Sequence, residues 1–200
     1  MISGCNNPRS IVICISGMAG CGKTTLAKKI AKKYDLLYFS GGDALKAIAI
    51  KEGYSSTERG WWESEQGIEF LEQRRQNLTY DRKIDEELLK TAEKGNVVLD
   101  SWALPWLLKT GFKMWLEASP EQRARRIVQR DGTSYETALA AMKKKDAATK
   151  AIYKKLYGFN LGQDFSPFDL ILDVNNLPPE EVMRAVSLVL DKLLIEKRCA

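Results

Sequence analysis

An eight-residue motif near the start of the chain limits its fold more than any other feature. It reads Gly-Met-Ala-Gly-Cys-Gly-Lys-Thr over residues 17–24 and fits the pattern G-x-x-x-x-G-K-[ST] at every fixed position. Residues 10–16 precede it as a nearly unbroken β-branched run, which is typical of a strand buried on both faces of a parallel sheet. Leu26, Ile30 and Ala31 follow it with helical spacing. The motif therefore lies between a strand and a helix, as a phosphate-binding loop must.

Each part of this motif has a physical role in binding a nucleoside triphosphate. The glycines let the backbone curl so that successive N–H groups form an anion nest at the positive end of a helix. Lys23 can reach the β- and γ-phosphates, and the Thr24 hydroxyl can ligate Mg²⁺. A chance glycine-rich turn is the alternative, which the strand–loop–helix context disfavours. The residues expected to bind ATP are Gly17, Met18, Ala19, Gly20, Cys21, Gly22, Lys23, Thr24 and Thr25.

The rest of the chain alternates between predicted strands and predicted helices. Further strands are expected at residues 36–39, 97–100, 112–116 and 168–174. Helices are expected at residues 23–34, 44–51, 81–94 and 178–197, and two more begin at residue 119 and at a cap over 133–136, the second running to 158. A capping box at 55–58 opens a further, irregular helical stretch that ends at 77. This alternation predicts an α/β fold, a single domain over residues 1–200 with a doubly wound five-stranded parallel sheet, helices on both faces and a helical lid.

Polar residues stand at the ends of two predicted strands, where such a sheet binds its ligands. Asp100 is a candidate for holding Mg²⁺, for catalysis and for orienting the phosphoryl acceptor, and a cap for the helix after Ala103 is the alternative. Ser40 and Asp43 follow the second strand on the same sheet edge, so we expect them to bind the acceptor. The N-cap of the next helix is an equally open interpretation of Asp43.

The region after residue 119 is strongly basic. Arg123, Arg126 and Arg130 are spaced i, i+3, i+7 and share one helix face. Phosphoryl transfer depends mainly on charge neutralisation and positioning, so we expect Arg126 and Arg130 to act with Lys23 and Asp100 in catalysis. A lid is expected over about residues 130–158 and an acceptor-binding segment over about 40–80. A solvated charged face is the alternative for the lysines between 143 and 155.

Composition excludes several other chemistries. The chain contains no histidine, which removes histidine general bases and metal ligands. Its four cysteines have no C-x-x-C spacing, so reduced thiols in a cytoplasmic protein are expected. No apolar run approaches the roughly 18 residues of a membrane span. The net charge is +5. We expect these basic residues to bind nucleotide phosphates and a small-molecule acceptor rather than nucleic acid.

Several sequence blocks occur in a characteristic order along most of the chain. Besides the phosphate-binding motif they are residues 40–43, 81–100, 123–134, 153–158 and 168–173, whereas residues 53–80 match least well. Together these blocks resemble the short cytidylate kinases found mainly in archaea. The resemblance implies a nucleoside monophosphate kinase fold and transfer of the ATP γ-phosphate to CMP or dCMP with Mg²⁺. It carries over the phosphate-binding loop, Asp43, Arg126 and Arg130 by position.

Four places depart from the pattern of this family. Trp102 and Ile152 stand where the family has arginine, Glu86-Glu87 stand where the helix usually continues with arginine, and Lys145 replaces another arginine. Arginine grips phosphate bidentately, so a second hypothesis is a kinase for a hydroxyl-bearing metabolite that carries no phosphate. A third is an ATP-responsive protein that binds RNA or regulates a partner through the basic helix.

Four tryptophans are notable in so small a chain because they stand in two close pairs. They are Trp61, Trp62, Trp102 and Trp106. Large aromatic side chains lie more often in a core or an interface than against a ligand, so packing is the prediction, with stacking on a base as the alternative.

Overall fold

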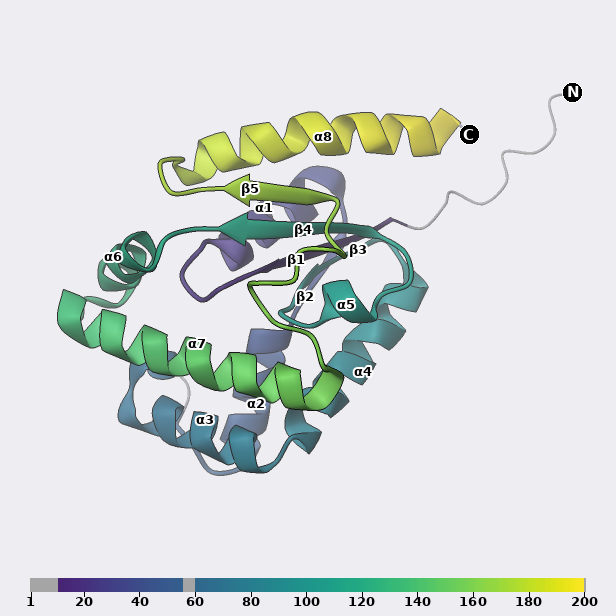
Figure 1. Ribbon diagram of the computed structural model, residues 1–200. Helices are drawn as coiled ribbons and strands as arrows, with labels where there is room; N and C mark the ends of the chain where they lie inside the picture. Colours follow the sequence, from purple (N-terminus) through teal and green to yellow (C-terminus); the bar gives the residue numbers. More distant parts are fainter. Residues whose placement is uncertain (1–10, 56–59, 200) are drawn as a thin grey trace, which may run out of the picture.

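The computed structural model describes residues 11–55 and 60–199, which are built around one parallel sheet (Figure 1). Its strands are β1 (Val12–Gly17), β2 (Leu37–Ser40), β3 (Val97–Asp100), β4 (Phe112–Glu117) and β5 (Leu170–Asp173). Their spatial order is β2-β3-β1-β4-β5, and every neighbouring pair is parallel. The predicted five-stranded doubly wound α/β fold is confirmed.

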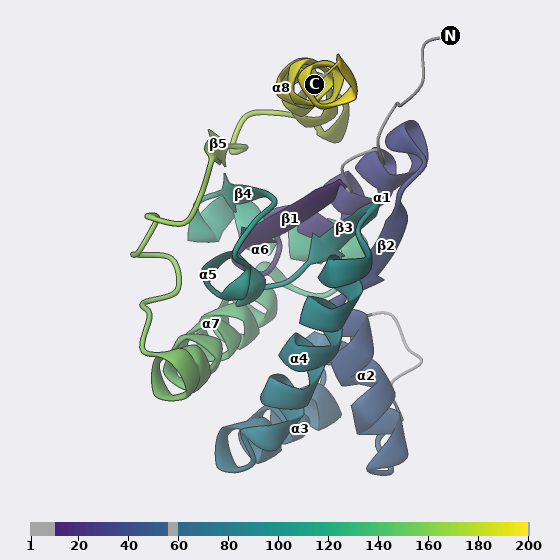
Figure 2. The ribbon, with the colours of Figure 1, turned by 90° about the vertical axis from the view of Figure 1, so that its right-hand side faces the viewer.

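Helices cover both faces of this sheet. Helices α1 (Lys23–Tyr34) and α8 (Pro179–Cys199) lie together on one side, as Figures 1 and 2 show. The other side carries α2 (Gly41–Lys51), the 3₁₀ turn Trp61–Glu63, α3 (Glu65–Gln76), α4 (Thr79–Lys94), α5 (Leu104–Leu107) and α7 (Tyr135–Tyr157), with α6 (Pro120–Asp131) near the end of β4. Across the described residues, no helix combines the length and apolarity that crossing a membrane requires.

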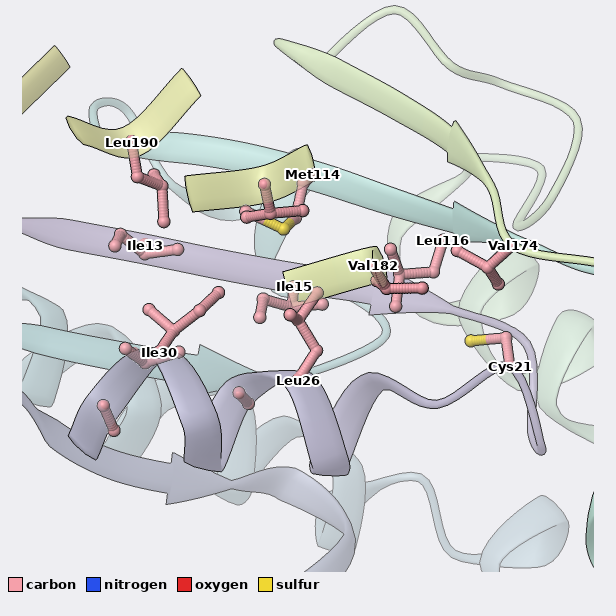
Figure 3. Packing of buried hydrophobic residues seen from close by; sticks show 14 of the residues in the cluster. Ile13, Ile15, Cys21, Leu26, Ile30, Met114, Leu116, Val174, Val182 and Leu190 are labelled. Carbon is pink, nitrogen blue, oxygen red and sulfur yellow. The ribbon is translucent and has the colours of Figure 1, made fainter. Parts of the chain in front are cut away.

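The packing of β1 explains why its sequence is apolar at almost every position. Ile13 and Ile15 pack against Leu26 and Ile30 of α1 (Figure 3). Val12 and Cys14 belong to a separate cluster that includes residues of α2 and α4. Both sets are buried, so each face of the strand needs apolar side chains. This fixes the strand at the centre of the sheet and places its C-terminal end beneath the phosphate-binding loop.

Most element bounds agree with the prediction to within a few residues, and the start of α2 shows the physical cause of one such difference. The helix begins at Gly41 rather than Ala44, because the Ser40 hydroxyl accepts a hydrogen bond from the backbone N–H of Asp43 at 3.2 Å. Ser40 is therefore the N-cap, and the interpretation of Asp43 as the cap is wrong. The capping box expected at 55–58 lies mostly outside the described residues.

Candidate active site

The C-terminal ends of the central strands enclose one large cleft. Asp100 pairs in register with Ile15 of β1 and with Ser40 of β2, so the polar strand ends meet beside the phosphate-binding loop. The cleft has a volume of about 1020 Å³ and is lined by that loop, the start of α2, one face of α4, α6, α7 and the segment after β5. This volume lies at the upper end of ordinary ligand sites, as a site for two substrates requires.

The phosphate-binding loop takes backbone conformations that favour glycine. Gly17, Gly20 and Gly22 have φ values of 144°, 82° and 102°, all in the region that other residues rarely adopt. Helix α1 then starts at Lys23 with no side-chain cap and no acidic residue in its first turn. Its first backbone N–H groups therefore lack intrahelical acceptors, and the end of the helix dipole favours an anion there.

Gly17 and Gly22 provide a matched stability test. A Cβ at Gly17 would lie 2.5 Å from the Leu116 carbonyl oxygen and 2.7 Å from Cys21 Sγ, whereas a Cβ at Gly22 meets nothing within 4 Å. Gly17→Ala adds a backbone clash to the strained φ, so we expect it to cost about 2–5 kcal/mol of unfolding free energy. Gly22→Ala should cost only about 1–2 kcal/mol. Urea unfolding of both variants measures the difference, and equal losses would contradict the packing argument.

The structure brings the two predicted metal-binding side chains together. Thr24 Oγ1 donates to Asp100 Oδ2 at 2.6 Å. Asp100 is 6% exposed, and this burial raises the pKa of its carboxyl, while Lys23 and the Thr24 hydroxyl act in the opposite direction. A hydroxyl and a carboxylate suit Mg²⁺, which typically takes one or two protein oxygens together with phosphates and water. Asp100 is not the helix cap, since Ser101 Oγ accepts from the N–H groups of Ala103 and Leu104.

Three cationic side chains hold carbonyl oxygens of the phosphate-binding loop. Lys23 Nζ lies 3.1 Å from the Met18 oxygen. Arg126 donates to the Cys21 oxygen at 3.1 Å and also to the Val174 oxygen. Arg123 donates to the Ala19 oxygen at 3.0 Å and to Asp146 Oδ2 at 2.7 Å. The spacing of these arginines predicted their shared face, but it did not reveal that Arg123 anchors the loop to α7.

The other two predicted basic features are placed as follows. Arg130 lines the cleft and pairs with Asp131. Residues 135–157 of the expected lid form α7, which packs against α3 and α6. The catalytic roles expected of Lys23, Asp100, Arg126 and Arg130 stay predictions.

The far end of the cleft contains residues to which, Lys145 apart, sequence reasoning gave no role. Asp81 and Asp85 line it from α4, Lys46 from α2, and Lys145 and Tyr153 from α7. The aspartates are spaced i, i+4 on the same helix face as the buried Ile84. Charged residues are unusual on a helix face that is otherwise apolar and buried. This pattern is visible in the sequence and could have identified both aspartates as candidate site residues.

A buried polar cluster stands behind this end of the cleft. Arg74 of α3 holds both oxygens of Asp81, at 3.2 Å from Nε and 2.5 Å from Nη2. The Tyr153 hydroxyl donates to Asp81 at 3.3 Å, and the Tyr157 hydroxyl donates to Asp85 at 2.9 Å. Burial raises the pKa of Asp85 to about 7, and the neighbouring Asp81 adds to the rise. Arg74 is therefore the cation that interacts with both carboxyls, but its two hydrogen bonds go to Asp81.

The tryptophans divide between packing and the cleft. Trp106 stacks on Phe159 with 4.0 Å between ring centroids, so the packing prediction is confirmed for this residue. Trp61 is 3% exposed and meets Trp62 edge to face, yet both also border the cleft. Trp102 lines the cleft as well. Its indole N–H donates to the Gly17 oxygen at 3.0 Å, and Lys23 Nζ lies 5.7 Å from its ring centre.

Comparison with known proteins agrees with this geometry. A family model described as "Cytidylate kinase-like family" matches residues 12–176. The chain belongs to this family. The cytidylate kinase of Methanocaldococcus jannaschii is 34% identical over 188 residues, covering 92% of this chain and 99% of the relative. That of Pyrococcus horikoshii is 32% identical over 184 residues, covering 92% and 90%.

Family membership confirms the expected type of enzyme, an ATP-dependent phosphotransferase of the nucleoside monophosphate kinase type that acts on a small-molecule acceptor. Among solved structures, a shikimate kinase from Bacteroides thetaiotaomicron aligns with a TM-score of 0.55 at 17% identity, covering 90% of this chain and 98% of that chain. At this identity the likeness shows the P-loop kinase fold alone.

Proposed function

We propose that the protein transfers the γ-phosphate of ATP to CMP or dCMP, with Mg²⁺ as the metal cofactor, in the cytoplasm. The observation that carries this proposal is the continuous cleft, which joins the phosphate-binding loop to a second end with lysines, carboxyls and aromatic walls. A phosphorylated nucleoside needs cations for its phosphate and a polar, flat pocket for its base. Membership in a family whose relatives are cytidylate kinases supports the same acceptor.

The donor end supplies charge rather than covalent chemistry. The N-terminus of α1 and Lys23 would bind the β- and γ-phosphates, and Arg126 and Arg130 would offset the negative charge that spreads over the transferred group. Thr24 and Asp100 would hold Mg²⁺. When bound, this ion neutralises phosphate charge and orients the donor.

The acceptor end contains two lysines, of which Lys145 stands where the family pattern has arginine. Lys46 lies on α2, one turn after Asp43, and Lys145 projects from α7 with its Nζ 4.5 Å from the centre of the Trp62 ring. We assign the acceptor phosphate to these two lysines, and the positioning of the acceptor to Ser40, Asp43 and Asp100. Lysine binds phosphate as a point charge, so the grip differs from the bidentate one of arginine.

Lys145 and Lys144 form a matched pair for testing this assignment. Lys145 is buried and lines the cleft, whereas Lys144 is exposed on the same helix. Lys145→Met is expected to raise the KM for CMP about tenfold or more, because one charge-assisted phosphate contact is lost, and to leave the KM for ATP within a factor of two or three. Lys144→Met should leave both constants unchanged. Steady-state kinetics with each substrate varied in turn measures the effect, and equal changes in both KM values would contradict the assignment.

A panel of nucleoside monophosphates tests the proposed function itself. Formation of ADP is followed by a coupled assay with CMP, dCMP, UMP, AMP and GMP at saturating ATP and Mg²⁺. The highest kcat/KM is expected with CMP or dCMP. Failure of every nucleotide, while ATP still binds, would refute the nucleotide acceptor.

Trp102 favours one alternative acceptor class. Its indole is hydrogen-bonded to the phosphate-binding loop beside Lys23, at a place where the family pattern has arginine. An apolar wall there suits a hydroxyl compound without a phosphate. A library of small metabolites in the same coupled assay distinguishes the two, since only this alternative predicts turnover with acceptors that carry no phosphate.

A further inference from the structure

Asp85 has an unsatisfied oxygen at the acceptor end of the cleft. The residue is 2% exposed and yet borders the cleft. Its Oδ2 accepts from the Tyr157 hydroxyl at 2.9 Å, and among the described residues no donor reaches Oδ1. Because Asp85 lines the cleft, this second oxygen is available for a hydrogen bond to a bound ligand.

The surroundings favour the neutral form of this carboxyl. Arg74 is committed to Asp81 through two hydrogen bonds, so a charge on Asp85 would be buried with no cation of the described residues hydrogen-bonded to it, which is costly. The pKa of Asp85 is accordingly raised to about 7 by burial and by Asp81, with Tyr157 and Arg74 opposing the rise. The titratable groups that interact with it are Arg74 from α3, Asp81 from α4, Tyr153 and Tyr157 from α7, and Cys14 from β1.

A neutral carboxyl offers one donor beside one acceptor. Cytosine presents the complementary pair, because its N4 amino group donates and its ring N3 has a free lone pair. An ionised carboxylate would still accept from the amino group but would face the N3 lone pair with negative charge. Because the Tyr157 hydroxyl donates to Oδ2, that oxygen is kept as the acceptor and the acid proton lies on Oδ1. Uracil reverses the pattern of the base, with N3–H as a donor and O4 as an acceptor. In the same orientation it would place its N3–H against the carboxyl O–H and its O4 against Oδ2.

We propose that Asp85 determines acceptor specificity by reading the base as a neutral carboxyl, with its O–H donating to a ring nitrogen and its other oxygen accepting from the adjacent amino group. The proposal rests on the proposed function, because it assigns the base subsite of the same acceptor. Binding of the acceptor then requires a proton on Asp85. At a pH above the pKa of Asp85 in the unliganded enzyme, the binding of each nucleotide is therefore accompanied by the uptake of one proton.

Two substitutions separate recognition from a structural role. Asp85→Asn keeps a donor and an acceptor but cannot ionise, whereas Asp85→Leu keeps neither. Glu86→Gln is the matched control, because Glu86 is the exposed neighbour on the same helix. The kcat/KM for CMP and for UMP is measured between pH 5.5 and 9 at saturating ATP.

For the wild-type enzyme, kcat/KM with CMP should fall about tenfold per pH unit above about 7, mainly through KM. Asp85→Asn should remove this fall and exceed the wild type at pH 9. Asp85→Leu should lose about 10- to 100-fold in kcat/KM at pH 6, together with much of the preference for CMP over UMP. Glu86→Gln should follow the wild type.

Calorimetry gives a second measurement, the number of protons taken up when CMP binds. This number would not depend on Asp85 if the residue served only in packing. CMP is titrated into the enzyme with a non-hydrolysable ATP analogue at pH 8, in two buffers that differ in ionisation enthalpy. Uptake of nearly one proton is expected for the wild type and none for Asp85→Asn. Identical pH profiles and identical proton uptake in both proteins would overturn the proposal while leaving the kinase assignment intact. Absence of turnover with every nucleoside monophosphate would instead refute the proposed function, and this proposal with it.

Discussion

Replacement of Lys23 by alanine is expected to lower kcat/KM for phosphoryl transfer by about a thousandfold. Lys23 is the only charged residue within the motif at 17–24, and its ammonium group is already directed to the loop by its contact with the Met18 oxygen. Loss of one preorganised charge at the transferred phosphate typically costs two to three orders of magnitude, about 10²–10³ in rate. Stopped-flow or coupled kinetics with ATP and CMP measures it.

Lys32→Ala is the appropriate control for this experiment. Lys32 lies in the last turn of the same helix and is exposed, so its removal changes the net charge equally without touching the cleft. It should leave kcat/KM within about twofold of the wild type. Thermal melting of Lys23→Ala shows whether the loop has kept its structure, since Lys23 also contacts a loop carbonyl. A Lys23→Ala enzyme that stays folded and keeps more than a tenth of its activity would contradict the assigned role.

The donor half of the site was predictable from sequence because it is built from consecutive residues. Local backbone geometry makes the loop, and one strand before it and one helix after it position Lys23 and Thr24. Asp100 was also within reach of prediction, because parallel strands end at the same edge of a sheet. Its contact with Thr24 spans 76 positions of the sequence, yet it follows from the strand order alone.

The acceptor half was harder to predict because it is assembled from side chains on separate helices. Asp81, Asp85, Lys145 and Tyr153 converge on the cleft only in the folded chain, where the tyrosines of α7 donate to the aspartates of α4. Hydrophobic periodicity identifies these helices and their buried faces, but it does not say which polar residue on one helix meets which on another. The cap interpretation left open for Asp43 failed for a similar reason, since Ser40 and Asp43 are both suitable N-cap residues and the register of the strand end decides between them.

The arginines of α6 connect the two halves. Arg123 is 5% exposed and joins the Ala19 carbonyl of the donor loop to Asp146 of α7. Lys145 precedes Asp146 in α7 and lines the acceptor end of the cleft. One side chain thus couples the position of the ATP-binding loop to that of the acceptor helix. The three basic residues on this helix face therefore do not act alike: Arg123 and Arg126 both hold loop carbonyls, but only Arg126 and Arg130 border the cleft.

The buried pair of Arg74 and Asp81 carries the largest expected effect on stability. Both side chains are almost fully buried, at 0% and 1% exposure. Arg74→Ala leaves the Asp81 charge without its partner, so the free energy of unfolding should fall by about 3–5 kcal/mol. For a chain of this size that corresponds to a melting temperature lower by roughly 10 °C. Chemical denaturation and calorimetry measure the two quantities.

Arg75 supplies the comparison, because it differs from Arg74 by one position and has an ion pair of its own. Its partner is Glu72, and both side chains are 49% exposed, so Arg75→Ala should cost no more than about 0.5 kcal/mol. The double variant Arg74→Met with Asp81→Asn removes both charges, and it should recover part of the stability lost in Arg74→Met alone, since the unpaired buried carboxylate is then gone. If the double variant were instead less stable than Arg74→Met, the loss would come from packing around Arg74. A similar loss for Arg74→Ala and Arg75→Ala would show that burial of the pair has no particular importance for the fold.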